Sequence, residues 1–463
     1  MFDVAHGAFA KHGDSFFLEE TGGVLIISKA LWDKGQEEIH QKRHFLFSKR
    51  QEALSGLVAQ LQAPESFSLA HDLPNEAILL TEKTTVTLSN IEISEKLFFV
   101  LLRKTKVDVG EDFSITEDID SEDCIMEHGM GGNTPICLER PEAVPSLALE
   151  NIKRMPPNSI GCILKRVDLF STWLINILPK LRIHEDCEVG DLTLNTDREE
   201  HVAGILKHDQ MFCVGRVERM NLSEYAVGVI TKVNLKDCEI EWLGLHASEE
   251  EYITEILKQE KPFCVGRVKN MWLGDYAVGV ITKMSLKDCE IEHLKLYATR
   301  REHVAAVLAQ KKPFCVGRVK RMWLYEYAVG VITKMSLKDC EVEDLSLAAS
   351  EKAHVAGILK QENPFCVGRV KNMDLEDYAV GVITKMTINE DNTMERFVLA
   401  GYGDHFSRIL EEGDNSIDLG RIRTGGLHVP ERIKRKLRYT LVDGDGKEVL
   451  EEEEPSQRGN LLE

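Results

Sequence analysis

The sequence predicts an α/β repeat solenoid of about 51-residue units, preceded by a small α+β domain. Three observations predict it. Most of the cysteines recur at alternating intervals of 25 and 26 residues, and a long stretch returns almost unchanged after 51 residues. Each copy also contains one helical and two strand-like hydrophobic patterns. Because a single unit of this kind cannot bury its apolar face, consecutive units should stack.

Composition limits the class of protein. A chain of 463 residues exceeds one ordinary core, so we expect two to three domains or one elongated array. The net charge of -20 argues against nucleic acid as a partner, since phosphate binding needs a basic surface. No apolar run reaches membrane-spanning length and the start does not have the layout of a signal peptide, so a cytosolic protein is expected.

The cysteines follow the repeat. Those in register are Cys162, Cys187, Cys213, Cys238, Cys264, Cys289, Cys315, Cys340 and Cys366. Metal clusters need several ligands close together, and evenly spaced single thiols without a Cys-x-x-Cys pair do not supply them. We therefore expect buried, reduced cysteines that act as small hydrophobes, with no metal and no cofactor.

The repeats divide the chain into three parts. The stretch "FCVGRVKNMWLGDYAVGVITKMSLKDCEIEHLKL" returns 51 residues later as "FCVGRVKRMWLYEYAVGVITKMSLKDCEVEDLSL", and the second cysteine is lost near Asp391 in the final copy. We expect an amino-terminal domain over 1–160, five repeats over 161–412, and a capping segment with a hairpin and an acidic flexible tail over 413–463.

Each unit should contain one amphipathic helix of about three turns. In "TRREHVAAVLAQ", Thr299 is predicted as the N-cap with Glu302 as its capping-box partner, and Pro313 closes the segment. Thr196 with Glu199 and Ser248 with Glu251 repeat the box. His201, His303 and His354 share one helix position, and we expect partly buried side chains there rather than metal ligands.

Three apolar triads compete for the strands of each unit. In the third full copy they begin at Val319, Ile332 and Val342, and only two of them can form a parallel ladder. The segment "ITKMSLKDCEV" has the spacing L-x-x-L-x-L-x-x-C-x-L and resembles a leucine-rich repeat. The alternation of shorter and longer units resembles the arrays of NOD-like innate-immune receptors. This resemblance implies a protein-binding surface and a role in innate-immune or cell-death signalling, although another three-strand-plus-helix repeat would give a similar pattern.

The candidate partner-binding residues point outward from the strands. On a strand, the residues between the apolar positions face away from the core. The predicted set comprises Lys269, Asn270, Trp272, Lys320, Arg321, Trp323, Arg219 and Lys371. Two interpretations stay open: the tryptophans and cations anchor a protein partner, or basic and acidic strands simply pair across the sheet.

The amino-terminal part is not repetitive. Strands are expected at 22–28, 43–49, 84–93 and 96–104, with a helix at 50–62. The pieces "MFDVAHGAFAKHGD", "GGVLIIS", "KRHFLFSKR", "EKLFFVLLRK" and "MPPNSIGCILKRVDL" resemble landmarks of the gasdermin amino-terminal domain. This resemblance implies a pore-forming protein whose amino-terminal segment acts on membranes and whose repeats regulate it.

The sequence favours a non-enzymatic cytosolic protein-recognition scaffold. It contains no G-x-x-x-x-G-K-[ST], G-x-S-x-G or H-E-x-x-H motif. The gasdermin-like pore is the first alternative, and an enzyme in the amino-terminal domain is the second. At the other end, "RYTLV" and "KEVLEEE" around "DGDG" predict a hairpin.

Overall fold

The computed structural model describes residues 8–31, 63–117, 123–128, 134–140, 145–184, 186–207 and 210–449. The chain divides into two compact units, one up to Leu235 and one from Lys236 onward. Each unit is described by itself.

The first unit begins with an antiparallel sheet. Its strands lie in the order β1 (Ala8–His12), β2 (Ser15–Glu20), β3 (Gly23–Ser28) and β5 (Ile78–Leu80). Phe16, Leu25 and Leu79 belong to its buried hydrophobic cluster. The strand predicted at 22–28 is confirmed as β3. The strand predicted at 43–49 and the helix predicted at 50–62 lie outside the described residues.

Parallel strands follow this sheet. One sheet has the order β4 (Ser66–Leu69), β6 (Thr85–Leu88) and β8 (Lys106–Val109); another has the order β10 (Ile125–Glu127), β7 (Ile91–Ser94), β9 (Ser114–Thr116), β12 (Ile160–Gly161) and β14 (Leu181–Arg182). Apart from β10, these strands pair in parallel. The prediction of one strand at 84–93 is right only in part, because the segment forms two strands, β6 and β7, in different sheets. The domain boundary near residue 160 stays a prediction.

The segment 96–104 is a helix, so its prediction as a strand was wrong. The helix α3 (Glu95–Lys104) begins after Ser94, whose hydroxyl accepts a 3.3 Å hydrogen bond from the N–H of Leu97, as serine does at an N-cap. All residues from Leu97 to Leu102 are buried. A helix without a polar face shows no helical periodicity, so its pattern looks like that of a buried strand.

The first unit ends in a run of parallel strands with helical connections. The strands, in order, are β11 (Ile136–Arg140), β13 (Leu164–Phe170), β15 (Glu188–Thr196) and β16 (Arg216–Glu224). The helical segments are α4 (Ser146–Arg154), η2 (Trp173–Lys180), η3 (Glu199–His201), α5 (Ala203–Leu206) and η4 (Tyr225–Lys232), where η marks a 3-10 helix. Leu192 pairs with Met220 in the shared register, so the apolar positions lie side by side.

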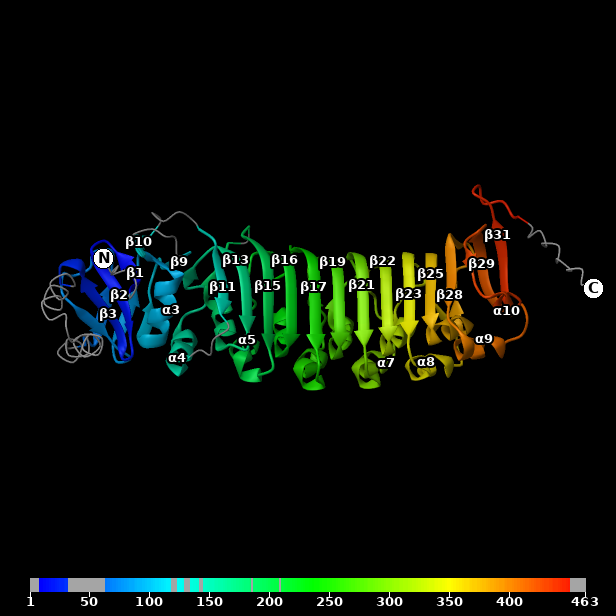
Figure 1. The fold of residues 1–463 in the computed structure, drawn as a ribbon, viewed down its shortest axis with the longest axis horizontal. Helices are drawn as coiled ribbons and strands as arrows, with labels where there is room; N and C mark the ends of the chain where they lie inside the picture. Colours follow the sequence, from blue (N-terminus) through cyan, green and yellow to red (C-terminus); the bar gives the residue numbers. More distant parts are fainter. Residues whose placement is uncertain are drawn as a thin grey trace, which may run out of the picture. The chain divides into compact units, whose positions relative to one another are not determined.

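The second unit has the consecutively paired parallel strands of a repeat solenoid (Figure 1). Their order is β17 (Glu239–Ala247), β19 (Arg267–Asp275), β21 (Glu290–Ala298), β22 (Arg318–Glu326), β23 (Glu341–Ala349), β25 (Arg369–Asp377), β28 (Arg396–Ala400) and β30 (Leu427–His428). Strand starts alternate between 28 residues (239 to 267) and 23 residues (267 to 290), which together give the repeat of 51.

The structure decides which apolar triads form the ladder. Val319 and Val342 begin the two ladder triads of the third copy, on β22 and β23. The remaining triad does not join the ladder: Met335 forms an isolated parallel bridge with Phe314. Its counterparts form the two-stranded pairs β18 (Phe263–Cys264) with β20 (Met284–Ser285), and β24 (Phe365–Cys366) with β26 (Met386–Thr387).

The leucine-rich frame of "ITKMSLKDCEV" was therefore misplaced. In that pattern the cysteine follows a strand, but Cys340 precedes the ladder strand β23, which starts at Glu341. Its backbone N–H bonds the carbonyl of Leu337 at 2.9 Å, in the turn that leads into the strand. Cys340 thus lies just before a ladder strand rather than after one.

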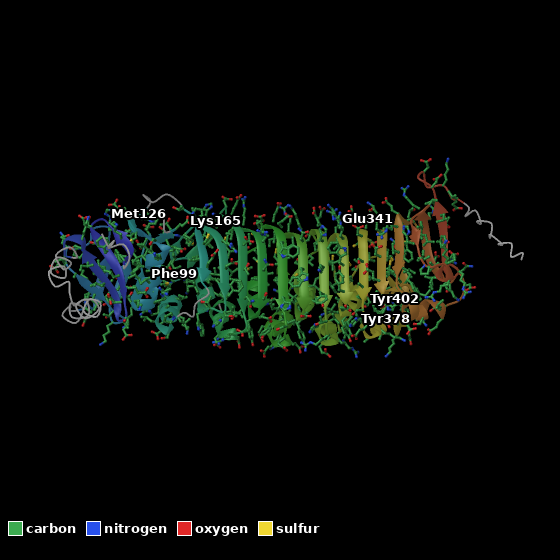
Figure 2. All side chains as sticks on the ribbon, viewed as in Figure 1. Phe99, Met126, Lys165, Glu341, Tyr378 and Tyr402 are labelled. Atoms are coloured by element: carbon green, nitrogen blue, oxygen red, sulfur yellow. The ribbon has the colours of Figure 1, made fainter. Side chains whose placement is uncertain are left out.

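Short helical segments lie at the carboxyl ends of the ladder strands (Figure 1). They comprise η5 (Glu250–Ile253), α6 (Thr254–Lys258), η6 (Tyr276–Lys283), η7 (Arg301–Val304), α7 (Ala305–Leu308), η8 (Tyr327–Lys334), α8 (Lys352–Leu359), η9 (Tyr378–Lys385), η10 (Gly403–Phe406) and α9 (Ser407–Leu410). In Figure 2, Glu341 lies at the start of its strand, whereas Tyr378 and Tyr402 lie at the helical end of the coils.

The predicted helix caps were wrong. The N-cap residues are Arg198, Glu249 and Arg300, instead of Thr196, Ser248 and Thr299. The Thr299 hydroxyl instead donates to a carboxylate of another coil, as shown below. The helical segment from Arg301 to Leu308 is also shorter than the three turns that the sequence predicts.

The end of the second unit contains a small parallel sheet of β27 (Thr393–Met394), β29 (Ile417–Arg423) and β31 (Leu437–Val442), with α10 (Glu431–Lys434) before β31. The predicted hairpin is seen as an antiparallel bridge between Val442 and Glu448. The Asp443 carboxylate accepts from the N–H groups of Asp445 and Lys447, which fixes the turn. The predicted flexible tail lies outside the described residues from position 450 onward.

Candidate functional site

The outward face of the second-unit ladder is lined mostly by paired charges. Glu and Arg face each other at the start of neighbouring strands: Glu239 with Arg267, Glu290 with Arg318, and Glu341 with Arg369. Arg267 lies 2.9 Å from Glu239. Each exposed pair of this kind contributes up to about 1 kcal/mol. The row thus presents little net charge.

All five predicted cations of the site belong to such pairs. The distances are 2.7 Å for Lys269 to Glu241, 3.7 Å for Lys320 to Glu292, 3.0 Å for Arg321 to Asp344, 3.6 Å for Lys371 to Glu341, and 2.9 Å for Arg219 to Asp191 in the first unit. Asn270 donates to the Glu241 carbonyl at 2.7 Å. The hydrogen bond from Lys269 to Glu241 raises the pKa of the lysine. These pairs agree with the interpretation in which basic and acidic strands neutralise each other.

Aromatic side chains interrupt the paired charges on four neighbouring strands, β17, β19, β21 and β22. We call this group the aromatic patch; it consists of Trp242, His246, Trp272, His293, Lys295, Tyr297, Trp323 and Tyr325. Trp242 is 37% exposed and Tyr297 38% exposed, and the other members are half-buried. The strand register places Lys295 between the two tryptophans Trp272 and Trp323.

Trp272 is held flat across the sheet. Its ring stacks on His246 with a centroid distance of 6.0 Å and an interplanar angle of 8°. Gly274 makes this possible: a Cβ there would lie 2.9 Å from the His246 ring and 3.2 Å from the Trp272 ring. The equivalent positions hold Ser223, Tyr325 and Glu376. Gly274 therefore makes room for the Trp272 ring and is not a residue that every repeat has at this position.

The second half of the patch is built around Trp323 and Lys295. Trp323 contacts His293 edge to face, at 5.2 Å between ring centroids, and Arg321 donates to the Nε2 of His293 at 3.2 Å. The Lys295 ammonium lies 5.2 Å from the centre of the Tyr325 ring, within cation–π range. The patch thus offers ring faces and edges with one cation at its centre.

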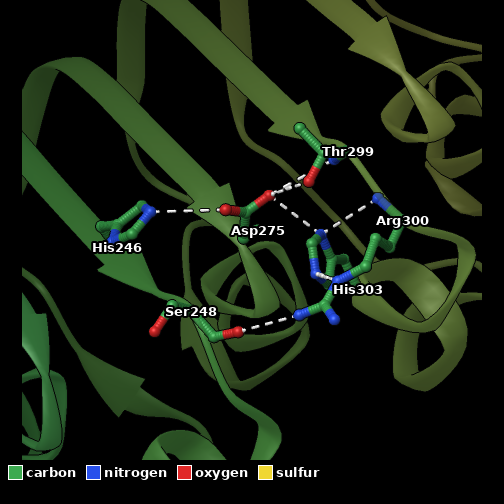
Figure 3. A network of polar contacts seen from close by, with 6 residues as sticks. All are labelled: His246, Ser248, Asp275, Thr299, Arg300 and His303. Carbon is green, nitrogen blue, oxygen red and sulfur yellow. Dashed lines mark hydrogen bonds and ion pairs between the residues drawn. The ribbon is translucent and has the colours of Figure 1, made fainter.

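A polar network around the buried His303 supports the patch from the carboxyl end of β19 (Figure 3). Asp275 contacts the Nε2 of His246 at 3.4 Å, so it braces the ring on which Trp272 stacks. It also accepts from the Thr299 hydroxyl at 2.9 Å and contacts the Nδ1 of His303 at 2.9 Å. Asp275 adopts φ +52° and ψ −127°, which is uncommon for a residue with a Cβ. Its contacts hold this backbone in place.

His303 is a neutral imidazole in this network. Burial lowers its pKa, although the Asp275 carboxylate opposes the shift. Nε2 accepts from the Arg300 Nε at 3.0 Å, so the proton of the neutral ring lies on Nδ1, which contacts Asp275 at 2.9 Å. The Arg300 backbone N–H also lies 3.3 Å from Nδ1, and the shorter contact with the carboxylate is the one that a protonated Nδ1 makes. Arg300 in turn donates to the Ser248 carbonyl at 3.2 Å (Figure 3).

The contact between a histidine and a carboxylate recurs in later copies, as expected for a structural element of the repeat. His354 contacts Glu326 at 2.5 Å and His405 contacts Asp377 at 3.6 Å. A Thr–His–Asp grouping could suggest nucleophilic catalysis, but the Thr299 hydroxyl donates to the carboxylate. A histidine base has to hold the nucleophile's proton, and His303 bonds the carboxylate and Arg300 instead. Its geometry is that of a brace between coils.

The structure brings most of the predicted site residues onto one ladder. Lys269, Asn270 and Trp272 lie on β19; Lys320, Arg321 and Trp323 lie on β22; Lys371 lies on β25 and Arg219 on β16 of the first unit. Sequence reasoning missed His246, Lys295, Tyr297 and Tyr325. The alternation of side chains along a strand could have found two of them, because Lys295 and Tyr297 follow the outward His293 at intervals of two residues.

The cysteine prediction was right only in part. Cys187, Cys238 and Cys289 are buried, but Cys264 and Cys315 are exposed. The sulfur atoms of the exposed cysteines accept hydrogen bonds from the backbone; for example, the Gly317 N–H donates to the Cys315 sulfur at 3.4 Å. Burial of its thiol raises the pKa of Cys162 to about 12, and the neighbouring Cys187 adds a smaller increase.

Within the ranges described above, no group of three or more His, Cys, Asp or Glu side chains could hold a metal ion. Across the same ranges, no helix is long and apolar enough to span a membrane.

Comparison with known proteins found no matching family, no matching curated protein and no matching solved structure. The resemblances to leucine-rich arrays of NOD-like receptors and to the gasdermin amino-terminal domain stay predictions.

Proposed function

We propose that this protein is a non-enzymatic, cytosolic recognition scaffold that binds another protein through the aromatic patch of its second unit. The observation that carries this proposal is the placement of Lys295 between Trp272 and Trp323 on a face whose other charges are mostly paired. Tryptophan, tyrosine and arginine are enriched among the residues that dominate binding energy at interfaces. Paired charges around such a centre form a polar rim.

Rigidity supports the proposal. The patch lies on strands, and Trp272 is held by His246, which is braced by Asp275. Side chains that are fixed before binding lose little conformational entropy when a partner docks. A role in innate-immune or cell-death signalling rests on the resemblance of the repeats alone.

The proposal is tested by changing Trp272 and Trp323 to Ala together. Both rings are only half-buried, so the variant should fold with a melting temperature close to that of the unchanged chain. Its partners, captured from cell extract and then purified, should bind more weakly by about 2 kcal/mol or more, the range of interface hot spots.

A matched control changes Asn221 and Asp374 to Ala. These residues occupy the same repeat position as the tryptophans, one unit before Trp272 and one unit after Trp323. The control should retain binding. Equal loss in both double variants, or loss in neither, would rule out the patch as the recognition surface.

A further inference from the structure

The first unit contains a cavity of about 430 Å³ between α4, η2 and α5. Small-molecule sites commonly measure roughly 300–1,000 Å³, so this volume suits a small organic ligand. Leu149 and Ile152 line it from α4, and Trp173 and Pro179 line it from η2. The cavity thus has an apolar, partly aromatic wall.

Its charged lining is mostly basic. Lys153, Lys180 and Lys207 line the cavity, against one acid, Glu200. Lys180 has a structural task, since it donates to the Met155 carbonyl at 2.7 Å, as Lys283 does to the Gln259 carbonyl at 2.6 Å. Lys153 and Lys207 are exposed, and no ion pair involves them within the described part of the chain. They give an acidic protein a locally positive opening.

The cavity coincides with departures from the repeat. Where the next copies have Tyr276 and Gly279, this coil has Trp173 and Asn176. Asn176 is 7% exposed, and its Nδ2 donates to the His201 carbonyl at 2.7 Å and to the Trp173 carbonyl at 3.1 Å. Its Oδ1 is buried and has no hydrogen-bond partner among the described residues. Two backbone carbonyls thus fix the amide at the cavity wall.

A glycine on α5 makes room for that amide. Gly204 faces Asn176, and a Cβ at Gly204 would lie 2.5 Å from the Asn176 Oδ1. In one copy of the second unit the order is reversed, since Gly279 faces the Cβ of Ala306 at 3.6 Å. Trp173 and Asn176 thus replace the tyrosine and glycine of the later copies at the cavity, and Gly204 leaves the space that the amide fills.

We propose that this cavity binds a small organic anion with a flat apolar body. The apolar body lies against Trp173 and Ile152, and the carboxylate, sulfonate or phosphate group lies at Lys153 and Lys207. Aromatic rings favour flat apolar partners, and lysine supplies compact positive charge for an anionic group. The proposal is independent of the aromatic patch, which lies in the other unit.

The experiment titrates the full chain with 1-anilinonaphthalene-8-sulfonate, a flat aromatic anion whose fluorescence rises in apolar sites. N-phenyl-1-naphthylamine, the same ring system without the sulfonate, is the matched neutral probe. The variant Lys153→Gln/Lys207→Gln removes both cations. Lys258→Gln is the control, because Lys258 occupies the position of Lys207 one repeat later. Melting curves establish that each variant folds.

The sulfonate should bind saturably at one site, and the double lysine variant should weaken it by about fivefold to tenfold. The control should bind unchanged, and the neutral probe should bind equally to the unchanged chain, the double lysine variant and the control. Trp173→Tyr, which restores the repeat residue, should weaken both probes by about threefold. The proposal is overturned if the sulfonate does not saturate, or if the lysine and control variants bind it equally.

Discussion

His303 and Asp275 belong to different coils of the second unit, and their side chains meet at 2.9 Å between Nδ1 and Oδ1. Asp275 ends the ladder strand β19, whereas His303 lies in the helical segment η7 that follows the next strand. The contact therefore ties one coil to the next. Its recurrence at Glu326 with His354 and Asp377 with His405 makes it a regular part of the second unit.

Changing Asp275 should reveal both its contacts and its backbone strain. Asp275→Ala and Asp275→Gly both lose the bonds to Thr299 and His303. Only glycine adopts the positive φ of this residue without strain, so Asp275→Ala should be less stable than Asp275→Gly by about 1 kcal/mol. Denaturant unfolding measures the difference. An alanine variant as stable as the glycine variant would show that the backbone carries no strain.

The buried histidines should make the protein sensitive to mild acid. Burial lowers the folded-state pKa of His201 and His303 below the ordinary value of 6.5. The unfolded chain therefore takes up protons first as the pH falls, and stability is lost from about pH 6.5 downward until the folded-state pKa is passed. Melting temperatures between pH 7.5 and pH 5 measure this loss.

The control for that prediction is His303→Tyr. Tyr252 occupies the same position in an earlier copy, so the fold accepts the residue there. The variant should lose part of the acid sensitivity and keep the rest through His201. Identical pH profiles for the variant and the unchanged chain would contradict the assignment.

Asn176 and Gly204 should prove coupled. Gly204→Ala places a Cβ 2.5 Å from the Asn176 Oδ1, whose amide is fixed by two carbonyls. The overpacking should cost about 1–3 kcal/mol. In Asn176→Gly/Gly204→Ala, which recreates the pair Gly279 and Ala306, most of the alanine's cost should disappear. A double-variant cycle with additive effects would contradict this packing.

The paired charges of the ladder should matter little for stability. Lys269→Gln removes an exposed contact with Glu241, and the expected loss is below about 1 kcal/mol at low salt. The loss should shrink as salt is added, because exposed charges are screened. Denaturant unfolding at two salt concentrations measures it. A large, salt-independent loss would mean that this lysine has a buried structural role.

The repeat was predictable because identical residues recur at a fixed interval, and periodicity determines which faces are apolar. The choice among three triads was not, since Met335 is as apolar as Met322 and only the pairing register separates them. The strand error at 96–104 has the same origin. In α3 all residues from Leu97 to Leu102 are buried, so no polar face marks the helix.

The candidate site was predictable in its tryptophans and not in its surroundings. Trp272 and Trp323 stand out in the sequence, but their contacts with His246 and His293 join residues 26 and 30 positions apart. The role of Thr299 was misjudged for a related reason. A threonine before a helix suggests a local cap, whereas its actual acceptor, Asp275, comes from another coil.

The central claim is that a partner docks on the aromatic patch, and a photocrosslinker tests it most directly. Placed at Tyr297, p-benzoylphenylalanine lies within the patch, and placed at Tyr402, which is 76% exposed, it lies at the helical end of the coils. We predict a crosslinked partner from position 297 that excess unchanged chain suppresses and the Trp272→Ala/Trp323→Ala chain does not. Crosslinking from position 402 alone, or equal suppression by both competitors, would contradict the account.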